Sequence, residues 1–294
     1  MGEAAGLVSA MEAAVTTILM RSQAGKYKVW EMSAIMGLFL SLFYLIVIVA
    51  FRQVDDLWRA SGMALAIGLV SGAFGYVLGN STYIKALQYA GVSRAFPVSR
   101  GAYVLFTLAA GLLVFNEAIT LVTAAGVFLA FVGMFALTRP EQTNGSAGVR
   151  TTSKVKLGLL LAAAQGMVAT VVTLSIRVLL DEMSVIPLNA LRMPVGAFAM
   201  LAISFMTPGS FKIMRHGPKN LAVLAFIGFI GMGTGSLLFV YAVQEAGVAK
   251  TAILSTTSPL FALPLTALFL KEKVTRRILL GTVVTVLGIA LIVL

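Results

Sequence analysis

The segment Ala86-Leu-Gln-Tyr-Ala-Gly-Val92 occurs a second time in the chain as Ala242-Val-Gln-Glu-Ala-Gly-Val248. Both copies share the order Ala-x-Gln-x-Ala-Gly-Val, and in both a basic residue follows two positions later, Arg94 in the first and Lys250 in the second. Two apolar helices that resembled each other by composition alone would not share this order. The chain therefore contains an internal repeat that divides it into two halves.

The repeat extends to the last apolar stretch of each half. Each of these stretches follows a glutamate and carries two glycines at a constant distance from it: Glu117, Gly126 and Gly133 in the first half, and Glu272, Gly281 and Gly288 in the second. We predict two domains, residues 1–143 and 154–294, joined by a polar linker at 144–153. The two glutamates are expected to cap or charge helix N-termini.

The composition is that of a membrane protein. The chain of 294 residues is 59% apolar and 11% charged, with a mean hydropathy of +0.98, whereas about 25% of residues are charged in a soluble domain. Apolar runs near the length needed to cross a bilayer recur from end to end. They are too long for barrel strands of about ten residues, so we predict an all-α integral membrane fold.

Run lengths and Gly, Pro and charge punctuation predict ten transmembrane helices. They are residues 4–20, 30–51, 62–83, 95–115 and 120–137 in the first half, and 155–179, 185–206, 221–243, 249–270 and 277–294 in the second. Since five spans is an odd number, the second half must be inverted relative to the first. Inverted repeats are typical of secondary transporters whose substrate site lies where the halves meet, so we expect a central cavity.

Basic residues predict the orientation. Lys and Arg concentrate in the odd-numbered connectors, whereas the even-numbered ones carry mainly Arg52, Arg59 and Lys250. We expect the protein to be embedded among the lipids of a bacterial-type cytoplasmic (inner) membrane. The bias puts the odd connectors on the cytoplasmic side and both termini on the outer side of this membrane. The net charge of +11 is thereby accounted for without nucleic acid.

Several kinds of chemistry are excluded. The chain has no cysteine, and its one histidine, His216, lies in a basic connector, where it is expected to be solvated. The aspartates Asp55, Asp56 and Asp181 lie at connectors, which leaves no catalytic pair within a span. No phosphate-binding loop is present. We therefore expect no enzyme, no cofactor, no metal site and no ATP-driven step.

Short motifs near the ends of both halves resemble those of a known family. They are Ser258-Pro-Leu-Phe-Ala262, Phe269-Leu-Lys-Glu272, Gly281 and Gly288 in the second half, and Pro97-Val-Ser-Arg-Gly101 with Glu117 in the first. They resemble the last two helices of an EamA domain, and Arg192 stands where this family often has an arginine. The chain resembles a ten-helix member of the drug/metabolite transporter superfamily with two EamA-like halves.

This resemblance implies alternating access by two inverted halves around a central cavity. Members mostly export or exchange amino acids, drugs, sugars or nucleotide-linked metabolites, driven by gradients. We therefore expect a secondary transporter that exports or exchanges a small polar or amphipathic metabolite, an amino acid or a related compound, and that acts as a monomer or homodimer. A lipid-linked sugar flippase, or an accessory subunit of the same fold, is the alternative; a large basic cavity would favour it, and a small enclosed site would count against it.

Three charged residues lie well inside predicted spans, away from the span ends, where charge is costly and usually functional. Glu12 and Arg100 each lie roughly 12 Å deep, from opposite faces, and Arg192 lies slightly less deep on the side of Glu12. These depths allow ion pairs of Glu12 with Arg100 or Arg192. Glu12 is the candidate for a coupling proton or a substrate amine, unless it is interfacial. Either arginine is a candidate for gripping a carboxylate or phosphate, unless it forms a structural pair.

Polar uncharged residues complete the predicted substrate surface, although Ser and Thr near a proline also bond back to their own helix. The candidates are Asn80, Tyr83, Ser99, Ser255 and Thr256. Pro97 and Pro259 supply kinks that would act as gates. The matched glutamines of the repeat, Gln88 and Gln244, are expected to hydrogen-bond between helices.

Overall fold

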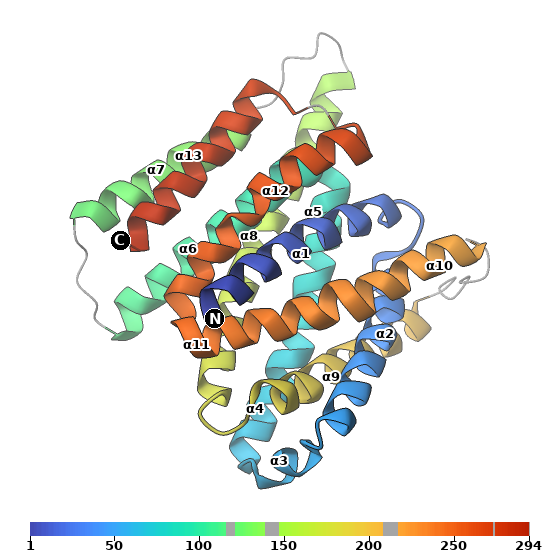
Figure 1. Ribbon diagram of the computed structural model, residues 1–294. Helices are drawn as coiled ribbons and strands as arrows, with labels where there is room; N and C mark the ends of the chain where they lie inside the picture. The colour runs from blue at the N-terminus through green and yellow to red at the C-terminus, as the bar shows by residue number, and fades with distance from the viewer. Residues whose placement is uncertain (116–120, 139–146, 208–216, 273, 294) are drawn as a thin grey trace.

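The computed structural model of the chain describes residues 1–115, 121–138, 147–207, 217–272 and 274–293 (Figure 1). Every regular element in these ranges is a helix, which agrees with the predicted all-α membrane fold. Glu117 and His216 lie outside the described residues, so the expectations for them remain predictions.

The first half has a helix or a helical stretch at each of its five predicted spans, and one short helix besides. The elements are α1 (Gly2–Gln23), α2 (Val29–Ala50), α3 (Val54–Arg59), α4 (Gly62–Phe74), the π-helical η1 (Gly75–Gly79), α5 (Asn80–Ala90), α6 (Val92–Phe115) and α7 (Leu121–Thr138). The short helix α3 was not predicted. Elements α4, η1 and α5 together form the third span, which runs on past its predicted end at residue 83.

The second half repeats this order. The elements are α8 (Ala147–Leu179), α9 (Val185–Met206), α10 (Gly217–Phe226), the π-helical η3 (Ile227–Thr234), α11 (Gly235–Thr256), α12 (Ser258–Leu265), the π-helical η4 (Thr266–Leu270) and α13 (Arg276–Val293). Helix α8 begins inside the predicted linker at 144–153. Both the third and the eighth span contain a π-helical segment, η1 and η3.

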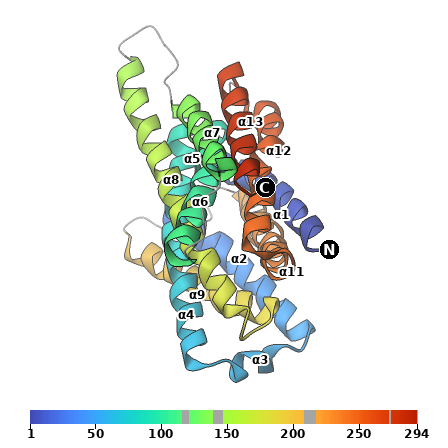
Figure 2. The ribbon, with the colours of Figure 1, turned by 90° about the vertical axis from the view of Figure 1, so that its left-hand side faces the viewer.

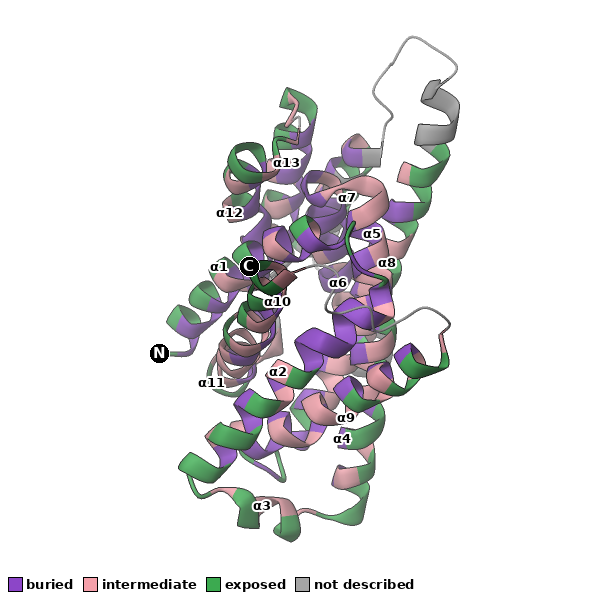
Figure 3. Cartoon of the chain, turned by 90° about the vertical axis from the view of Figure 1, so that its right-hand side faces the viewer, coloured by how far each residue is buried: buried purple, intermediate pink, exposed green. Residues whose placement is uncertain are grey.

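Seven helical stretches of the described residues are long and apolar enough to cross a membrane. The three other predicted spans correspond to α6, α7 and α13, which are helical over 24, 18 and 18 residues. The protein is thus an integral membrane protein, and the count of ten spans remains a prediction. Exposed positions, green in Figure 3, lie on the outer faces of the bundle, and buried positions face its interior.

The repeated motif ends the third and eighth spans with the same backbone. Gly91 has φ 74° and ψ 169°, and the matched Gly247 has φ 83° and ψ 165°. This region of backbone conformation is essentially restricted to glycine. The chain therefore breaks at the glycine of each copy, and α6 and the second part of α11 start immediately after it.

Helices α7 and α13 lie side by side at one edge of the bundle (Figures 1 and 2). A Cβ on Gly133 would meet the carbonyl of Gly281, and one on Gly288 would meet the carbonyl of Gly126. Small residues let transmembrane helices approach this closely. The repeated glycines thus face each other crosswise: Gly133 faces Gly281, which matches Gly126, and Gly126 faces Gly288, which matches Gly133.

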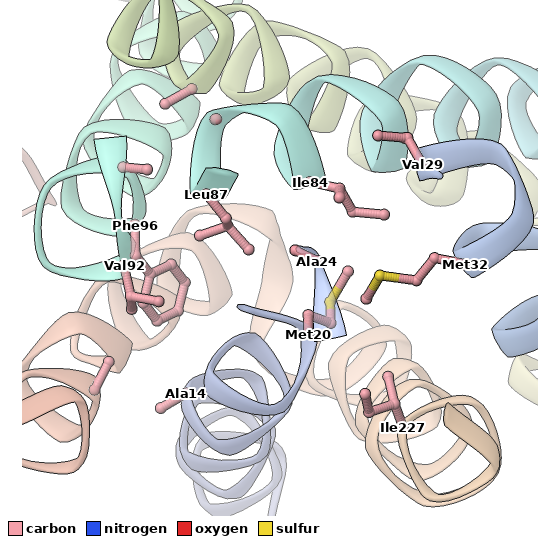
Figure 4. Close-up of a cluster of buried hydrophobic side chains, with 14 of the residues drawn as sticks. Ala14, Met20, Ala24, Val29, Met32, Ile84, Leu87, Val92, Phe96 and Ile227 are labelled. Atoms are coloured by element: carbon pink, nitrogen blue, oxygen red, sulfur yellow. The ribbon is translucent and has the colours of Figure 1, made fainter. Parts of the chain in front are cut away.

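The other helices pack around the two first helices of the halves. Helix α1 contacts α11 and α12, and α8 contacts α5 and α6 in the same way. Helices α2 and α9 pack against each other. An apolar cluster that includes Met20, Met32, Ile84, Leu87 and Phe96 joins the end of α1 to α2, α5 and α6 (Figure 4).

The molecule has two ends, which we name by their connectors. The basic end contains the α1–α2 connector at 24–28, Gly91, Lys271 and Glu272. The opposite end contains the connectors at 51–61 and 180–184, together with Gly247. Contacts between connectors support this assignment: Arg21 lies 3.5 Å from Glu272 at the basic end, and the Ser61 amide lies 3.0 Å from Glu182 at the opposite end.

Candidate functional site

A cavity of about 300 Å³ lies at the centre of the bundle, between α1 on one side and α8 on the other. Its lining combines apolar side chains and glycines with hydroxyl, amide and guanidinium groups. The polar side chains that line it are Ser9, Thr16, Thr17, Asn80, Tyr83, Ser99, Arg100, Tyr103, Gln165, Thr173, Arg192, Ser236, Ser255 and Ser258.

The cavity brings together most of the residues that the sequence singles out. The predicted residues that line it are Asn80, Tyr83, Ser99, Arg100, Arg192 and Ser255. Thr256 is buried, but it is not part of the lining. Pro97, inside α6, and Pro259, in the first turn of α12, do not line it either, so their gating role remains a prediction.

The two halves contribute the same positions to the lining. Many lining residues are matched in pairs at the spacing that separates Gly91 from Gly247: Ser9 with Gln165, Ala13 with Ala169, Thr17 with Thr173, Asn80 with Ser236, and Ser99 with Ser255. The cavity therefore lies where the equivalent faces of both halves meet.

The charged residues break this match. At the same spacing, Arg100 corresponds to Thr256 and Arg192 corresponds to Met36. Glu12 corresponds in the same way to Val168. Each charge at the centre of the bundle therefore occurs in only one half.

Arg192 is held between α9 and α4. Its side chain is buried, with the whole residue 2% exposed, and its Nε donates to the Ser71 hydroxyl at 3.2 Å. Its Nη1 is buried without a hydrogen-bond partner in the described residues. The helices approach closely here because α4 has a glycine, Gly72, whose Cβ would meet the Arg192 backbone.

Arg100 reaches the cavity from α6. Its guanidinium carbon lies 5.2 Å from the centre of the Phe96 ring, one turn earlier, in a cation–π arrangement. Its Nε is buried without a partner. The guanidinium makes no hydrogen bond or ion pair with any part of the chain that the structure describes.

Glu12 contacts η3 and the start of α11 and pairs with neither arginine. Its Oε1 accepts a hydrogen bond from the Thr234 hydroxyl at 2.9 Å, and its Oε2 is buried without a partner near Gly235. The predicted pairs of Glu12 with Arg100 or Arg192 are therefore absent from the described residues. The depth estimate placed the charges along the membrane normal, but the rotation of α1 turns Glu12 toward η3 and α11.

Two polar contacts toward the basic end have no match toward the opposite end. The Thr17 hydroxyl lies 2.8 Å from the Tyr83 hydroxyl, and the Gln88 amide donates to the Ala24 carbonyl. At the matched positions of the opposite end stand Phe239, which has no hydroxyl, and Gln244, which is exposed and forms no bond with the described residues. The expectation of bonding between helices thus holds for Gln88 and not for Gln244.

Glu272 joins the two halves at the basic end. Its carboxylate accepts from the amides of Val92 and Ser93, both at 3.2 Å, and from the Ser93 hydroxyl at 3.0 Å. These groups form the first turn of α6, and carboxylates stabilise helix N-termini. Glu272 therefore caps a helix as predicted, but this helix belongs to the first half and is not the span that follows Glu272.

The sequence pattern of the EamA-like transporter family matches residues 1–139 and 156–294. The chain belongs to the EamA-like transporter family. Membership of the drug/metabolite transporter superfamily follows, as the terminal motifs predict. The protein is a membrane transporter and not an enzyme.

Curated relatives and a solved structure agree with this family. The chain is 28% identical over 234 residues to the glucose uptake protein GlcU of Bacillus subtilis (strain 168), a match that covers 77% of this chain and 75% of that protein. It is 27% identical over 238 residues to a putative sugar uptake protein of Bacillus cereus (strain ATCC 14579), covering 78% of each. A crystal structure superposes with a TM-score of 0.70 at 15% identity, covering 99% of this chain and 94% of the other, which shows the shared fold.

Sequence reasoning missed part of the lining of this EamA-like transporter. Ser9, Thr17, Gln165 and Thr173 lie on α1 and α8, where no motif drew attention to them. The repeat itself carried the signal: the spacing between Ser99 and Ser255 also pairs Ser9 with Gln165 and Thr17 with Thr173. A residue-by-residue match of the first and sixth spans would have found them.

Proposed function

We propose that the protein moves a small, hydroxyl-rich solute of the sugar class across the cytoplasmic membrane through its central cavity. The cavity carries this proposal, because its volume of about 300 Å³ is at the lower limit of sites for small ligands. Its lining offers many hydroxyl and amide groups that match the hydroxyls of a sugar. The names of the relatives, a glucose uptake protein and a putative sugar uptake protein, support the same class.

The lining disfavours the amino acid expected from the family resemblance. An amino acid carries an ammonium group, which proteins usually bind with a carboxylate. None of the described side chains that line the cavity is acidic, and Glu12 faces Thr234 outside it. The family resemblance leads us to expect export or exchange. Because the relatives are named for uptake, we do not include export in the proposal.

The proposed mechanism is alternating access by two inverted five-helix repeats. The shared backbone at Gly91 and Gly247, the matched lining and the reciprocal glycine contacts of α7 and α13 support a twofold relation between the halves. Such a relation lets the two ends exchange conformation around a fixed site. The Lys and Arg bias supports a cytoplasmic basic end with both termini outside.

Glu12 is the proposed carrier of a coupling proton. It lies within a span, about half-way along α1, and only one of its oxygens has a partner. Carboxylates in this setting often belong to proton relays in transporters. The lipid-linked sugar flippase is the less favoured alternative, because a cavity of this volume has little room for a lipid-carried headgroup.

Counterflow in proteoliposomes tests the proposed function. Vesicles loaded with unlabelled hexose should accumulate labelled hexose, whereas amino acid and nucleoside pairs should give no accumulation. Thr173→Val removes a lining hydroxyl and should lower the rate. Thr82→Val is the matched control. Thr173 donates to the Ala169 carbonyl of its own helix at 2.9 Å, and Thr82 donates to the Leu78 carbonyl at 2.6 Å in the same way. Thr82, however, lies outside the lining of the cavity.

Two results would contradict the proposal. Accumulation of an amino acid without any sugar or sugar derivative would assign another substrate class. Equal loss of rate in Thr173→Val and Thr82→Val, with the protein still folded, would remove the cavity from the transport path.

A further inference from the structure

The cavity has an excess of positive charge that a neutral sugar would leave unpaired. Arg100 and Arg192 are the charged side chains among the described residues of its lining. Arginine stays protonated in proteins. Two guanidinium groups therefore face one small cavity inside a membrane, with no lining carboxylate to balance them.

Neither guanidinium is satisfied by the protein. Arg192 uses Nε for Ser71 at 3.2 Å and leaves Nη1 buried and unpartnered, although the residue is only 2% exposed. Arg100 has an unpartnered, buried Nε and packs on Phe96. Burying a charge without a partner is costly, and charges inside spans usually pair or mark a substrate pathway.

The nearby acidic group is engaged elsewhere. Glu12 directs Oε1 to Thr234 at 2.9 Å, on the face of α1 toward η3. Even if the negative charge of Glu12 is set against one arginine, the positive charge of the other arginine has no counterpart among the described residues of the lining. Comparison of the two halves shows the same excess of positive charge. At the positions of the other half that correspond to Arg100 and Arg192 are the uncharged Thr256 and Met36.

From this geometry we infer that the substrate is an anionic sugar derivative, whose carboxylate or phosphate is bound by Arg100 and Arg192 while its hydroxyls meet the Ser, Thr, Asn and Gln side chains. This inference rests on the proposed function and narrows it. The planar guanidinium donates two parallel hydrogen bonds to such an oxyanion. A neutral sugar, which lacks this oxyanion, would still be carried but would bind more weakly, because the guanidinium donors then stay unpaired.

Competition against hexose counterflow tests the inference. D-glucose and D-glucuronate differ only at C6, where the hydroxymethyl group becomes a carboxylate, and glucose 6-phosphate adds a phosphate instead. The inference predicts that glucuronate or glucose 6-phosphate competes about ten- to a hundredfold better than glucose, since hydrogen bonds to charged groups are worth this much. Whichever anion competes best distinguishes a carboxylate from a phosphate substrate.

Substitutions tie the preference to the cavity. Arg100→Gln should reduce the ratio of anion to glucose competition to below about threefold, and Arg100→Lys should restore part of it, because a charge remains but the fork of donors is lost. Arg177→Gln is the control with the same charge change: Arg177 pairs with Asp181 on the exposed end of α8 at 2.6 Å and should leave the ratio unchanged. The ratio in the wild type tests the inference even if the Arg100 variants fail to fold.

The outcomes separate the two proposals. If glucose competes as well as both anions, the inference of an anionic substrate is wrong, whereas the proposed sugar transport is still supported. A preference for anions that Arg177→Gln abolishes as fully as Arg100→Gln would overturn the role of the cavity arginines. Absence of competition by all three compounds would overturn both the anionic substrate and the proposed function.

Discussion

The two halves of the molecule share a backbone and differ in charge. The glycine that ends the third span has the conformation of the glycine that ends the eighth, and the lining positions of one half recur in the other. Yet Arg100, Arg192 and Glu12 correspond to Thr256, Met36 and Val168. Under the proposed mechanism, the repeated backbone would serve the exchange between two conformations, and the unmatched charges would select the substrate.

The largest effect is expected where helices touch through glycine in both halves. A Cβ on Gly72 would meet the carbonyl of Arg192, and a Cβ on the matched Gly228 would meet that of Met36. Gly72→Ala and Gly228→Ala should each lower the free energy of unfolding by about 3 kcal/mol, the upper range for overpacking, because a backbone cannot move aside as a side chain does. Thermal melting in detergent measures this, and a loss confined to one variant would show that the halves are not equivalent.

The next largest effect separates stability from transport. Arg192→Met installs the residue that the first half has at the matched position. Replacing a buried charge by an apolar side chain of similar size is often neutral or stabilising, so Tm should stay constant or rise. Transport of the anionic substrate should fall about tenfold or more. A Tm that falls steeply together with transport would make Arg192 a structural residue.

A smaller difference is expected at the two glycines of the repeated motif. Gly91→Ala and Gly247→Ala should each cost about 1–3 kcal/mol of stability, because both positions need a backbone conformation that alanine resists. Gly91→Ala should cost more, since its Cβ would lie 2.8 Å from a carboxylate oxygen of Glu272, whereas nothing lies within 4 Å of a Cβ on Gly247. Equal changes in Tm would mean that the contact of Glu272 with α6 contributes nothing.

The smallest effect concerns the connectors and depends on pH. Hydrogen bonds from Ser61 hold the pKa of the Glu182 carboxyl below its usual value. A lowered pKa stabilises the fold above the unfolded value of about 4.3, and this stabilisation is lost as the pH falls through the folded value. Glu182→Gln should therefore lower Tm slightly at pH 7, and this effect should disappear at a pH below the folded pKa of Glu182.

The matched connector of the first half supplies the control for this pH dependence. Lys26 corresponds to Glu182 and donates to Asn220 at 2.8 Å. Because this contact involves no carboxylate, the change in Tm caused by Lys26→Gln should be the same at both pH values. A Glu182→Gln effect that persists at low pH would show that the hydrogen bond does not depend on the ionised carboxylate.

The spans could be predicted from the sequence because the bilayer fixes the length of an apolar run at about 20 residues. The candidate site could be predicted only in part. Counting residues placed Arg100 and Arg192 at the depth of the cavity, where they lie, but it could not give the rotation that turns Glu12 toward Thr234. The π-helical segments η1 and η3 were missed as well, because no sequence signal marked them.

The central claim, that the two ends open in turn around the cavity, is tested most directly by locking each end. The chain has no cysteine, so Gly25→Cys with Gln88→Cys can be bridged at the basic end by a bifunctional maleimide, and the matched Asp181→Cys with Gln244→Cys at the opposite end. Counterflow should stop when either pair is bridged and continue in the singly substituted proteins after the same treatment. Counterflow that continues with one end bridged would contradict alternating access.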